Sequence, residues 1–295
     1  MKILNFLARI TITKKNVYTS IVLSIVIAFI LTVFSIFIIK YTPFPQQIIS
    51  LNINSIDSII IINDSIVPPI LYNRMPNVKS IDYQERKQHF INIMLPTILI
   101  AQEIIKYQRD EIIRLRNTYT ETPDKDSMFI DLMKKFKAKS IDDLIIRMHP
   151  HPASIILAQA AVESGWGTSR FCSEANNLFG IWSFNKNDKR VAAGKTRDKK
   201  TIYLRKYDSL IESVIGYIYT IGRSSAFSKF RDTRLESKNP YRLIWLLDRY
   251  SEKRLEYIVT LRNTIERNNL SRYDSYSLAK IDKEDISWKK LIEKF

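Results

Sequence analysis

The sequence predicts a mainly helical (α+β) domain with one small β element, over roughly residues 76–275, preceded by a membrane-spanning helix. Three observations predict this class. Apolar residues recur at helical spacing over 83–117, the stretch 153–164 is almost wholly apolar, and a β-prone run at 201–204 lies inside a basic segment. Hydrophobic residues make up 45% of the 295 residues, which is enough for a packed core.

The N-terminal region predicts a membrane anchor. Residues 21–39 carry no charge, and as a helix they would extend over roughly 28 Å, close to the thickness of the hydrocarbon layer. Four basic and no acidic residues precede this stretch, which favours a cytoplasmic N-terminus and an exported remainder. We therefore expect a single-pass protein of the bacterial inner membrane with a periplasmic or extracytoplasmic domain. The expected parts are a cytoplasmic segment (1–16), a transmembrane helix (17–39), a linker or stalk (40–75), the main domain (76–275) and a tail (276–295).

The formal net charge of +16 would ordinarily suggest nucleic acid as a partner. Export removes that partner, so acidic wall polymers or anionic lipid headgroups are the expected contacts of the basic surface. The single cysteine, Cys172, excludes an intrachain disulfide and a cysteine-based metal cluster. His149 and His151 have no carboxylate at ligand spacing, so we expect packing or surface roles for them and neither a metal nor a cofactor. Oligomeric state does not follow from these patterns.

The elements expected along the main domain alternate helices with one hairpin. The amphipathic helix of 83–117 is followed by two short helices, the second with Ser140 as its N-cap. The composition then becomes basic between Phe184 and Tyr207, with Gly194 at a turn, which predicts a hairpin. The helices expected after 83–117, with the two short ones included, cover 128–136, 141–148, 153–164, 210–221, 241–250 and 252–268.

Glu163 is the single charge in the apolar helix of 153–164 and lies near its C-terminal end. Burial disfavours the charged form of a carboxyl group, so its pKa rises and a proton remains available near neutral pH. A general acid needs that proton. Alternatively, Glu163 is a capping or ion-paired residue, with Arg170 as its partner.

Glycines and aromatic residues cluster directly after Glu163. Only six glycines occur in the chain, and three of them, with two tryptophans, fall within 165–182. Glycine allows sharp turns of the backbone, aromatic faces stack on sugar rings, and side-chain amides can bind hydroxyl and N-acetyl groups. These residue types together predict a carbohydrate-binding site beside the carboxyl group.

The motifs LAQAAVESGWGTSRF (157–171) and NNLFGIW (176–182) resemble the glucosaminidase family of peptidoglycan hydrolases. The similarity extends through ERKQHFINIMLP (85–96), YDSLIESVIGYI (207–218) and YSEKRLEYIVTLRNTIERNNL (250–270) to the Bax-like subgroup, over about two-thirds of the chain. The resemblance implies a lysozyme-like fold and hydrolysis of the β-1,4 bond after N-acetylglucosamine, as an endo-β-N-acetylglucosaminidase. Glycine is usual in the family at the position of Arg254.

The resemblance also implies roles for individual residues. Glu163 matches the family's catalytic acid, and Tyr250 matches a tyrosine that faces the cleavage site; otherwise Tyr250 is a core residue. The substrate groove is expected to be lined by Trp166, Asn177, Phe179 and Trp182, although Phe179 and Trp182 fit a core equally well.

The second catalytic group stays open at this level. Glycoside hydrolysis usually needs a base or nucleophile opposite the acid. The candidates are the substrate's own N-acetyl group and four aspartates, Asp188, Asp198, Asp208 and Asp248. Two other functions also stay open, a non-catalytic membrane-anchored scaffold that binds the cell wall and a lytic transglycosylase of the same fold.

Overall fold

The structure is a computed structural model, and it describes residues 19, 21–31, 46–118, 127–197 and 200–295. The chain divides into two compact units, Met1–Pro45 and Gln46–Phe295. In the first unit Ile21–Leu31 forms a short apolar helix, and the rest of the predicted span 17–39 lies outside the described residues except for Thr19. The anchor and its topology therefore stay predictions.

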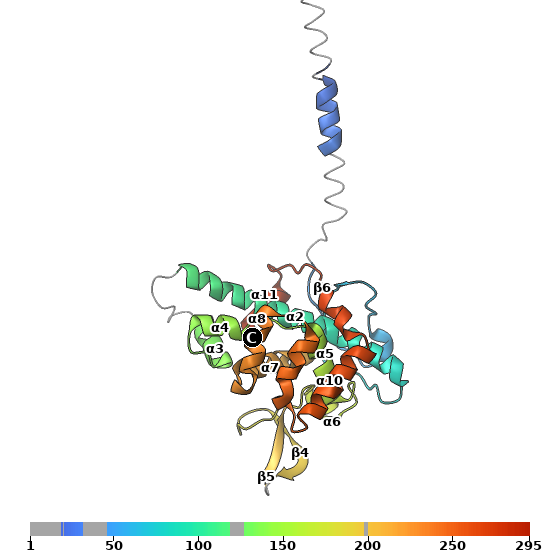
Figure 1. Ribbon diagram of the computed structural model, residues 1–295. Helices are drawn as coiled ribbons and strands as arrows, with labels where there is room; N and C mark the ends of the chain where they lie inside the picture. The colour runs from blue at the N-terminus through green and yellow to red at the C-terminus, as the bar shows by residue number, and fades with distance from the viewer. Residues whose placement is uncertain (1–18, 20, 32–45, 119–126, 198–199) are drawn as a thin grey trace, which may run out of the picture. The chain divides into compact units, whose positions relative to one another are not determined.

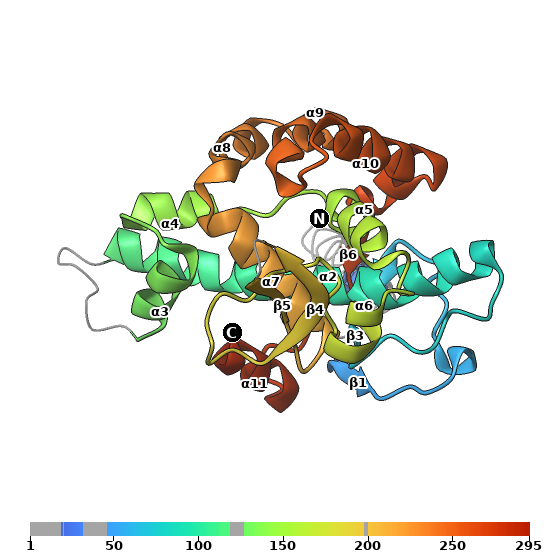
Figure 2. The same ribbon diagram turned by 90° about the horizontal axis from the view of Figure 1, so that it is seen from below.

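The second unit is built around one long helix, α2 (Tyr83–Thr118), which crosses it (Figures 1 and 2). Among the described residues α2 is the one helix long and apolar enough to cross a membrane, but 78% of its most apolar stretch is buried. Its apolar positions recur at helical spacing, as the sequence predicts, and they pack against α5 (Ala153–Ser164), α7 (Leu210–Arg223) and β3 (Ile70–Tyr72). We conclude that α2 is a core helix.

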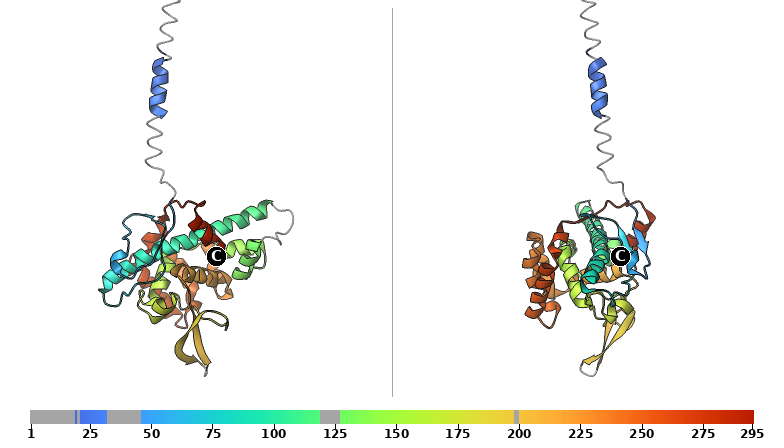
Figure 3. Two further views of the ribbon diagram at one scale, coloured as in Figure 1. Left: turned by 180° about the vertical axis from the view of Figure 1, so that it is seen from behind. Right: turned by 90° about the vertical axis from the view of Figure 1, so that its right-hand side faces the viewer.

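The remaining helices surround α2, α5 and α7 (Figure 3). The helix α10 (Leu255–Arg267) packs along α5, and its buried residues are spaced at three to four positions. The other α-helices are α3 (Ser127–Phe136), α4 (Ile141–Arg147), α6 (Arg170–Ala175), α8 (Ser228–Glu236), α9 (Pro240–Leu243) and α11 (Ile286–Lys294). Among the described residues, four 3₁₀ segments complete the helical part: η1 (Ile56–Ser58), η2 (Ser225–Phe227), η3 (Ile244–Tyr250) and η4 (Leu270–Ser275).

Strands are few and short. The predicted basic hairpin is present as β4 (Arg190–Arg197) and β5 (Lys200–Arg205), which pair antiparallel with an irregular register around Gly194 and project from the unit (Figure 3). Two further pairs are parallel: β1 (Ile49–Leu51) with β3, and β2 (Ile66–Val67) with β6 (Ser277–Leu278). The prediction of a mainly helical domain with a small β element is confirmed.

The compact unit is longer than the predicted 76–275. Residues 46–75, expected as part of a stalk, form β1, β2 and β3, and the side chains of Val67 and Tyr72 are fully buried. In the C-terminal tail Trp288 of α11 is also buried and packs edge-on against Tyr107 of α2. Both segments bury apolar side chains in the same core, and β2 of the first segment pairs with β6 of the second.

Candidate active site

Glu163 is the penultimate residue of α5, a helix in which ten of twelve residues are buried. The N-terminal turn of α5 is capped from another element, because the main-chain N–H and the hydroxyl of Ser154 both donate to the carboxylate of Asp274, over 2.8 and 2.7 Å. Glu163 itself is half-buried, and burial raises the pKa of its carboxyl group to about 7. Arg170 is not its partner, since that guanidinium pairs with Glu174 at 3.0 Å.

A left-handed turn follows Glu163. Gly165, Trp166 and Gly167 all have positive φ, at 58°, 56° and 84°. The hydroxyl of Ser164 donates to the carbonyl of Ala160 and accepts from the N–H of Gly167, which fixes the first part of the turn. Glycine adopts this conformation without steric cost, so two of the three residues in the turn are glycines.

Gly180 lies beside the Glu163 carboxyl group. Its φ is +63°, and a Cβ atom at this position would lie 3.6 Å from Oε2 of Glu163. Asn177 shapes this loop, because its amide donates to the carbonyls of Ile181 and Arg205, over 2.9 and 2.7 Å, and its side-chain oxygen accepts from the N–H of Ile181. The described contacts of Asn177 are therefore structural, and its role in substrate binding stays a prediction.

Two tyrosines complete the surroundings of Glu163. The hydroxyl of Tyr257 is hydrogen-bonded to the Glu163 carboxyl group. The ring of Tyr250 is stacked on that of Tyr257, with ring centroids 5.8 Å apart, and its hydroxyl donates to the carbonyl of Phe179 over 2.9 Å. Burial raises the pKa of both tyrosines well above the usual value, so both hydroxyl groups are neutral donors at neutral pH.

Tyr257 belongs to a longer chain of hydrogen bonds inside the protein. The amide nitrogen of Gln159 donates to the hydroxyl of Tyr257 over 2.9 Å, and the hydroxyl of Tyr217 donates to the side-chain oxygen of Gln159 over 2.6 Å. All three side chains are buried. Gln159 precedes Glu163 by four residues, so one face of α5 presents both side chains.

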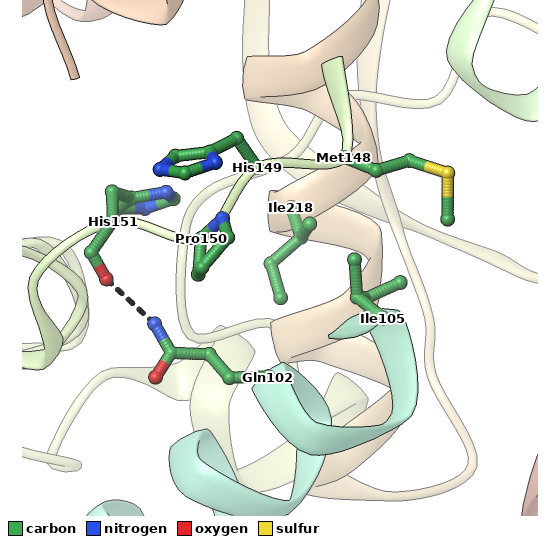
Figure 4. Close-up of a pocket in the computed structure, with 7 residues that line it drawn as sticks. All are labelled: Gln102, Ile105, Met148, His149, Pro150, His151 and Ile218. Atoms are coloured by element: carbon green, nitrogen blue, oxygen red, sulfur yellow. Dashed lines mark hydrogen bonds between the residues drawn. The ribbon is translucent and has the colours of Figure 1, made fainter. Parts of the chain in front are cut away.

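The chain of hydrogen bonds begins at Arg234. Its guanidinium donates to Nδ1 of His151 over 3.2 Å, and Nε2 of His151 lies 3.2 Å from the hydroxyl of Tyr217. A guanidinium can only donate, so Nδ1 is the acceptor and Nε2 carries the proton of the neutral imidazole. In each later hydrogen bond, the donor is then the group farther from Glu163 along this chain of hydrogen bonds, and the acceptor is the group nearer to it. Figure 4 shows His151 in the loop between α4 and α5, where Gln102 of α2 donates to its main-chain carbonyl over 2.6 Å.

The predicted aromatic residues fall into two groups. Phe179 and Trp166 are 1% and 8% exposed, and Phe179 stacks on Tyr217 with ring centroids 4.4 Å apart. Trp182 is 41% exposed and lies beside Phe184, which is 85% exposed, with ring centroids 5.9 Å apart. Only this second group presents a wide aromatic surface near the hairpin, and Phe184 was not predicted.

Three of the four candidate aspartates lie among the described residues. Each forms an ion pair with a neighbouring cation: Asp188 with Arg205 at 3.0 Å, Asp208 with Lys189 at 2.6 Å, and Asp248 with Arg254 at 3.1 Å. Asp198 lies outside the described residues. Within the described part of the chain no three His, Cys, Asp or Glu side chains come together as metal ligands.

Comparisons with known proteins match this region. Residues 142–270, which include α5, the hairpin and α10, match the family "Glucosaminidase: Mannosyl-glycoprotein endo-beta-N-acetylglucosaminidase". The chain is 28% identical over 159 residues to protein bax of Escherichia coli, which covers 51% of this chain and 56% of that protein. It is 31% identical over 116 residues to the exo-glucosaminidase LytG of Bacillus subtilis, which covers 37% and 39%.

Among solved structures, the chain is similar to the catalytic domain of the autolysin Auto from Listeria monocytogenes, with 23% identity and a TM-score of 0.35. The similarity covers 59% of this chain and 87% of that one. A peptidoglycan hydrolase from Sphingomonas sp. A1 has 23% identity and a TM-score of 0.35 over 49% and 85%. The lysozyme-like fold stays a prediction. The chain spans about half the length of protein bax and less of LytG. Residues 142–270 therefore match the glucosaminidase family, and the chain is similar to protein bax over 159 residues.

Proposed function

We propose that the protein is a peptidoglycan hydrolase that cleaves the β-1,4 glycosidic bond after N-acetylglucosamine, with Glu163 as the general acid. The observation that carries this proposal is the carboxyl group of Glu163, half-buried among Gly180, Tyr250 and Tyr257 in the segment that matches the family. Because burial raises its pKa to about 7, a large fraction of the side chain is protonated at neutral pH.

In the proposed reaction Glu163 protonates the glycosidic oxygen as the bond to the anomeric carbon breaks. Positive charge then develops on the sugar ring, and a second group must stabilise it or deliver water. No second carboxyl group is among the described groups that shift the pKa of Glu163, so we propose that the substrate's own acetamido oxygen takes this step. We propose that Tyr250 faces the same bond, since its ring is stacked on the tyrosine that holds Glu163.

The glycan would lie over the exposed aromatic pair of Trp182 and Phe184, which offers flat apolar surface for sugar rings. Trp166, Asn177 and Phe179 support this site from the turns that carry Glu163 and Gly180. We further propose that residues 17–39 anchor the protein in the bacterial inner membrane, with the hydrolase domain on the outer side.

The test is digestion of purified peptidoglycan by the full-length chain in detergent, with product ends read by mass spectrometry. The expected result is release of fragments with reducing N-acetylglucosamine ends, and a loss on the order of 10²–10⁴-fold in Glu163→Gln. Glu174→Gln is the matched control, because Glu174 is an exposed acid on the adjacent helix α6. Anhydro-muramyl ends would instead assign a lytic transglycosylase. Binding of peptidoglycan without release by the wild type would assign a non-catalytic scaffold.

A further inference from the structure

A groove with a volume of about 320 Å³ lies between the N-terminal part of α2 and the outer face of α10. It is lined by Tyr83 and Lys87 of α2, by Trp166, and by residues of the second half of α10 and the turn after it, among them Thr260, Asn263 and Arg267. We call it the Lys87–Arg267 groove. Glu163 does not line it, so it is separate from the carboxyl group described above.

The groove is positively charged. No Asp or Glu lines it, and among the described residues neither Lys87 nor Arg267 forms an ion pair. The contrast on the same helix is Arg262, which pairs with Glu266 at 2.9 Å. A ligand that carries a carboxylate would supply the opposite charge that these two cations lack.

Its cation and aromatic side chains are held in place. The amino group of Lys87 lies 4.2 Å from the ring centroid of Tyr83 and 5.6 Å from that of Trp166, so two aromatic faces fix its position. Trp166 is in turn packed edge-on against Phe90, with ring centroids 5.5 Å apart. Less side-chain entropy is therefore lost when a ligand contacts this lysine.

The groove also offers groups that suit a peptide backbone. The side-chain amide of Asn263 is half-buried and makes no hydrogen bond within the described part of the chain. An amide of this kind both donates and accepts, as a peptide bond does. The hydroxyl of Thr260 donates to the carbonyl of Glu256 over 2.8 Å, which leaves its oxygen free to accept from an N–H group.

The groove adjoins the catalytic segment through both of its walls. Trp166 follows Glu163 by three residues, across the left-handed turn, and Thr260 follows Tyr257 by three residues on α10. A polymer that placed a glycosidic bond at Glu163 could therefore reach the groove with a side branch. Peptidoglycan carries such branches, because short peptides with free carboxylates extend from its glycan strands.

We propose that the Lys87–Arg267 groove binds the carboxylate-bearing peptide stem of the substrate, an inference that rests on the proposed function. The enzyme then prefers glycan strands that retain their peptides. Lys87 and Arg267 bind stem carboxylates, and Asn263 binds a peptide bond between them.

The test compares kcat/KM on intact peptidoglycan with kcat/KM on strands whose peptides have been removed by an amidase. The proposal expects the ratio of the two to fall about tenfold in Lys87→Gln/Arg267→Gln, since tenfold corresponds to about 1.4 kcal/mol. The control, Lys134→Gln/Lys139→Gln, removes the same charge from exposed lysines of α3 and the loop after it, and its ratio should equal that of the wild type. An equal loss on both substrates in the groove variant would overturn the proposal, because the groove would then bind the strand itself.

Binding of a soluble stem pentapeptide to the full-length chain, measured by calorimetry at two salt concentrations, separates this proposal from the proposed function. If the wild type cleaves neither substrate but binds the pentapeptide, and the groove variant does not, the hydrolase assignment fails and the groove assignment stands. Absence of pentapeptide binding to the wild type would sink the groove assignment, whatever the enzyme cleaves.

Discussion

The hydroxyl group of Tyr257 is hydrogen-bonded to the carboxyl group of Glu163, and it is the last donor in a chain that begins at the buried guanidinium of Arg234. Every member of the chain donates toward Glu163, so the polarisation of each bond adds to that of the next. Burial and this hydrogen bond act in opposite directions on Glu163. Burial raises its pKa, and the Tyr257 hydroxyl lowers it by stabilising the carboxylate.

Tyr257→Phe should raise the pKa of Glu163. A general acid works in its protonated form, so activity falls as the pH rises through that pKa. Loss of the hydrogen bond to the carboxylate, worth about 1.5–3 kcal/mol, should move this falling limb to higher pH by about one to two units. The measurement is kcat/KM on peptidoglycan between pH 5 and pH 9.

Tyr241→Phe is the control for this substitution. Tyr241 is a half-buried tyrosine of α9 whose hydroxyl makes no hydrogen bond in the described part of the chain. Its profile should coincide with that of the wild type. A Tyr257→Phe profile that is lower at all pH values but not displaced would mean that Tyr257 only supports the fold.

Glu163→Gln should make the protein more stable than the wild type at high pH, and it should also remove activity. The folded carboxyl group titrates at about 7 and the unfolded one near 4.5, so the folded state binds more protons between these values. The favourable contribution of Glu163 is therefore complete below about 4.5 and is lost as the pH rises through about 7. This difference corresponds to roughly 3 kcal/mol, which glutamine does not lose.

Urea unfolding of both proteins at pH 4.5 and pH 8 measures this effect. The difference in free energy of unfolding between Glu163→Gln and the wild type should become more favourable to the variant at pH 8 by up to about 3 kcal/mol. Glu174→Gln, which replaces an exposed acid, should show no such dependence. A difference that is equal at the two pH values would contradict the raised pKa.

The sequence predicts the parts of this site that depend on local patterns. An apolar helix with one carboxyl group identifies Glu163, and the glycines that follow it predict a sharp turn, which the structure shows to be left-handed at Gly165 and Gly167. The hairpin is also predictable, because a turn glycine and a β-prone run are neighbours in sequence. These elements are fixed by contacts within a few residues.

The hydrogen-bonded chain could not be predicted in this way. Gln159 reaches Tyr257 across 98 positions and Tyr217 across 58, so only the packing of α5, α7 and α10 brings them together. One signal was present, because Gln159 is a polar side chain four residues before Glu163 on an otherwise apolar helix. The strands of 46–75 were missed for a similar reason, since β2 pairs with β6, more than two hundred residues later.

Gly180→Ala should reduce activity through a direct effect on Glu163. A methyl group at this position would lie 3.6 Å from Oε2, in ordinary van der Waals contact, and would occupy space beside the carboxyl group that the substrate atom receiving the proton needs. Gly194→Ala is the matched control, because Gly194 also has positive φ, +71°, but a Cβ atom there would meet nothing within 4 Å. Both variants should lose about 1 kcal/mol of stability from the backbone conformation.

Activity should distinguish these two variants. A displacement of the substrate from the proton donor by about 1 Å costs on the order of 10²-fold, so Gly180→Ala should lose about that much in kcat and Gly194→Ala should resemble the wild type. The measurement is kcat on peptidoglycan below the melting temperature of both. Equal activities would mean that the space beside Oε2 is not used by the substrate.

Arg254→Gly should stabilise the protein. Arg254 precedes α10 with φ 49° and ψ −112°, a conformation that is strained for any residue with a side chain and open to glycine. Its ion pair with Asp248, at 3.1 Å, joins two exposed side chains and is worth 1 kcal/mol or less by the ~0.2–1 kcal/mol typical of such pairs. Relief of the strain should exceed this loss and the greater flexibility of glycine in the unfolded chain, which leaves a net gain of about 1 kcal/mol.

Arg254→Ala separates the two effects, because alanine loses the ion pair and keeps the strain, so its free energy of unfolding should lie at or below that of the wild type. The strained residue also directly precedes the helix that carries Tyr257. If Arg254→Gly gains stability and kcat falls, the strain contributes to the position of Tyr257 at Glu163; if stability rises with kcat retained, the arginine is a local cost to the fold alone.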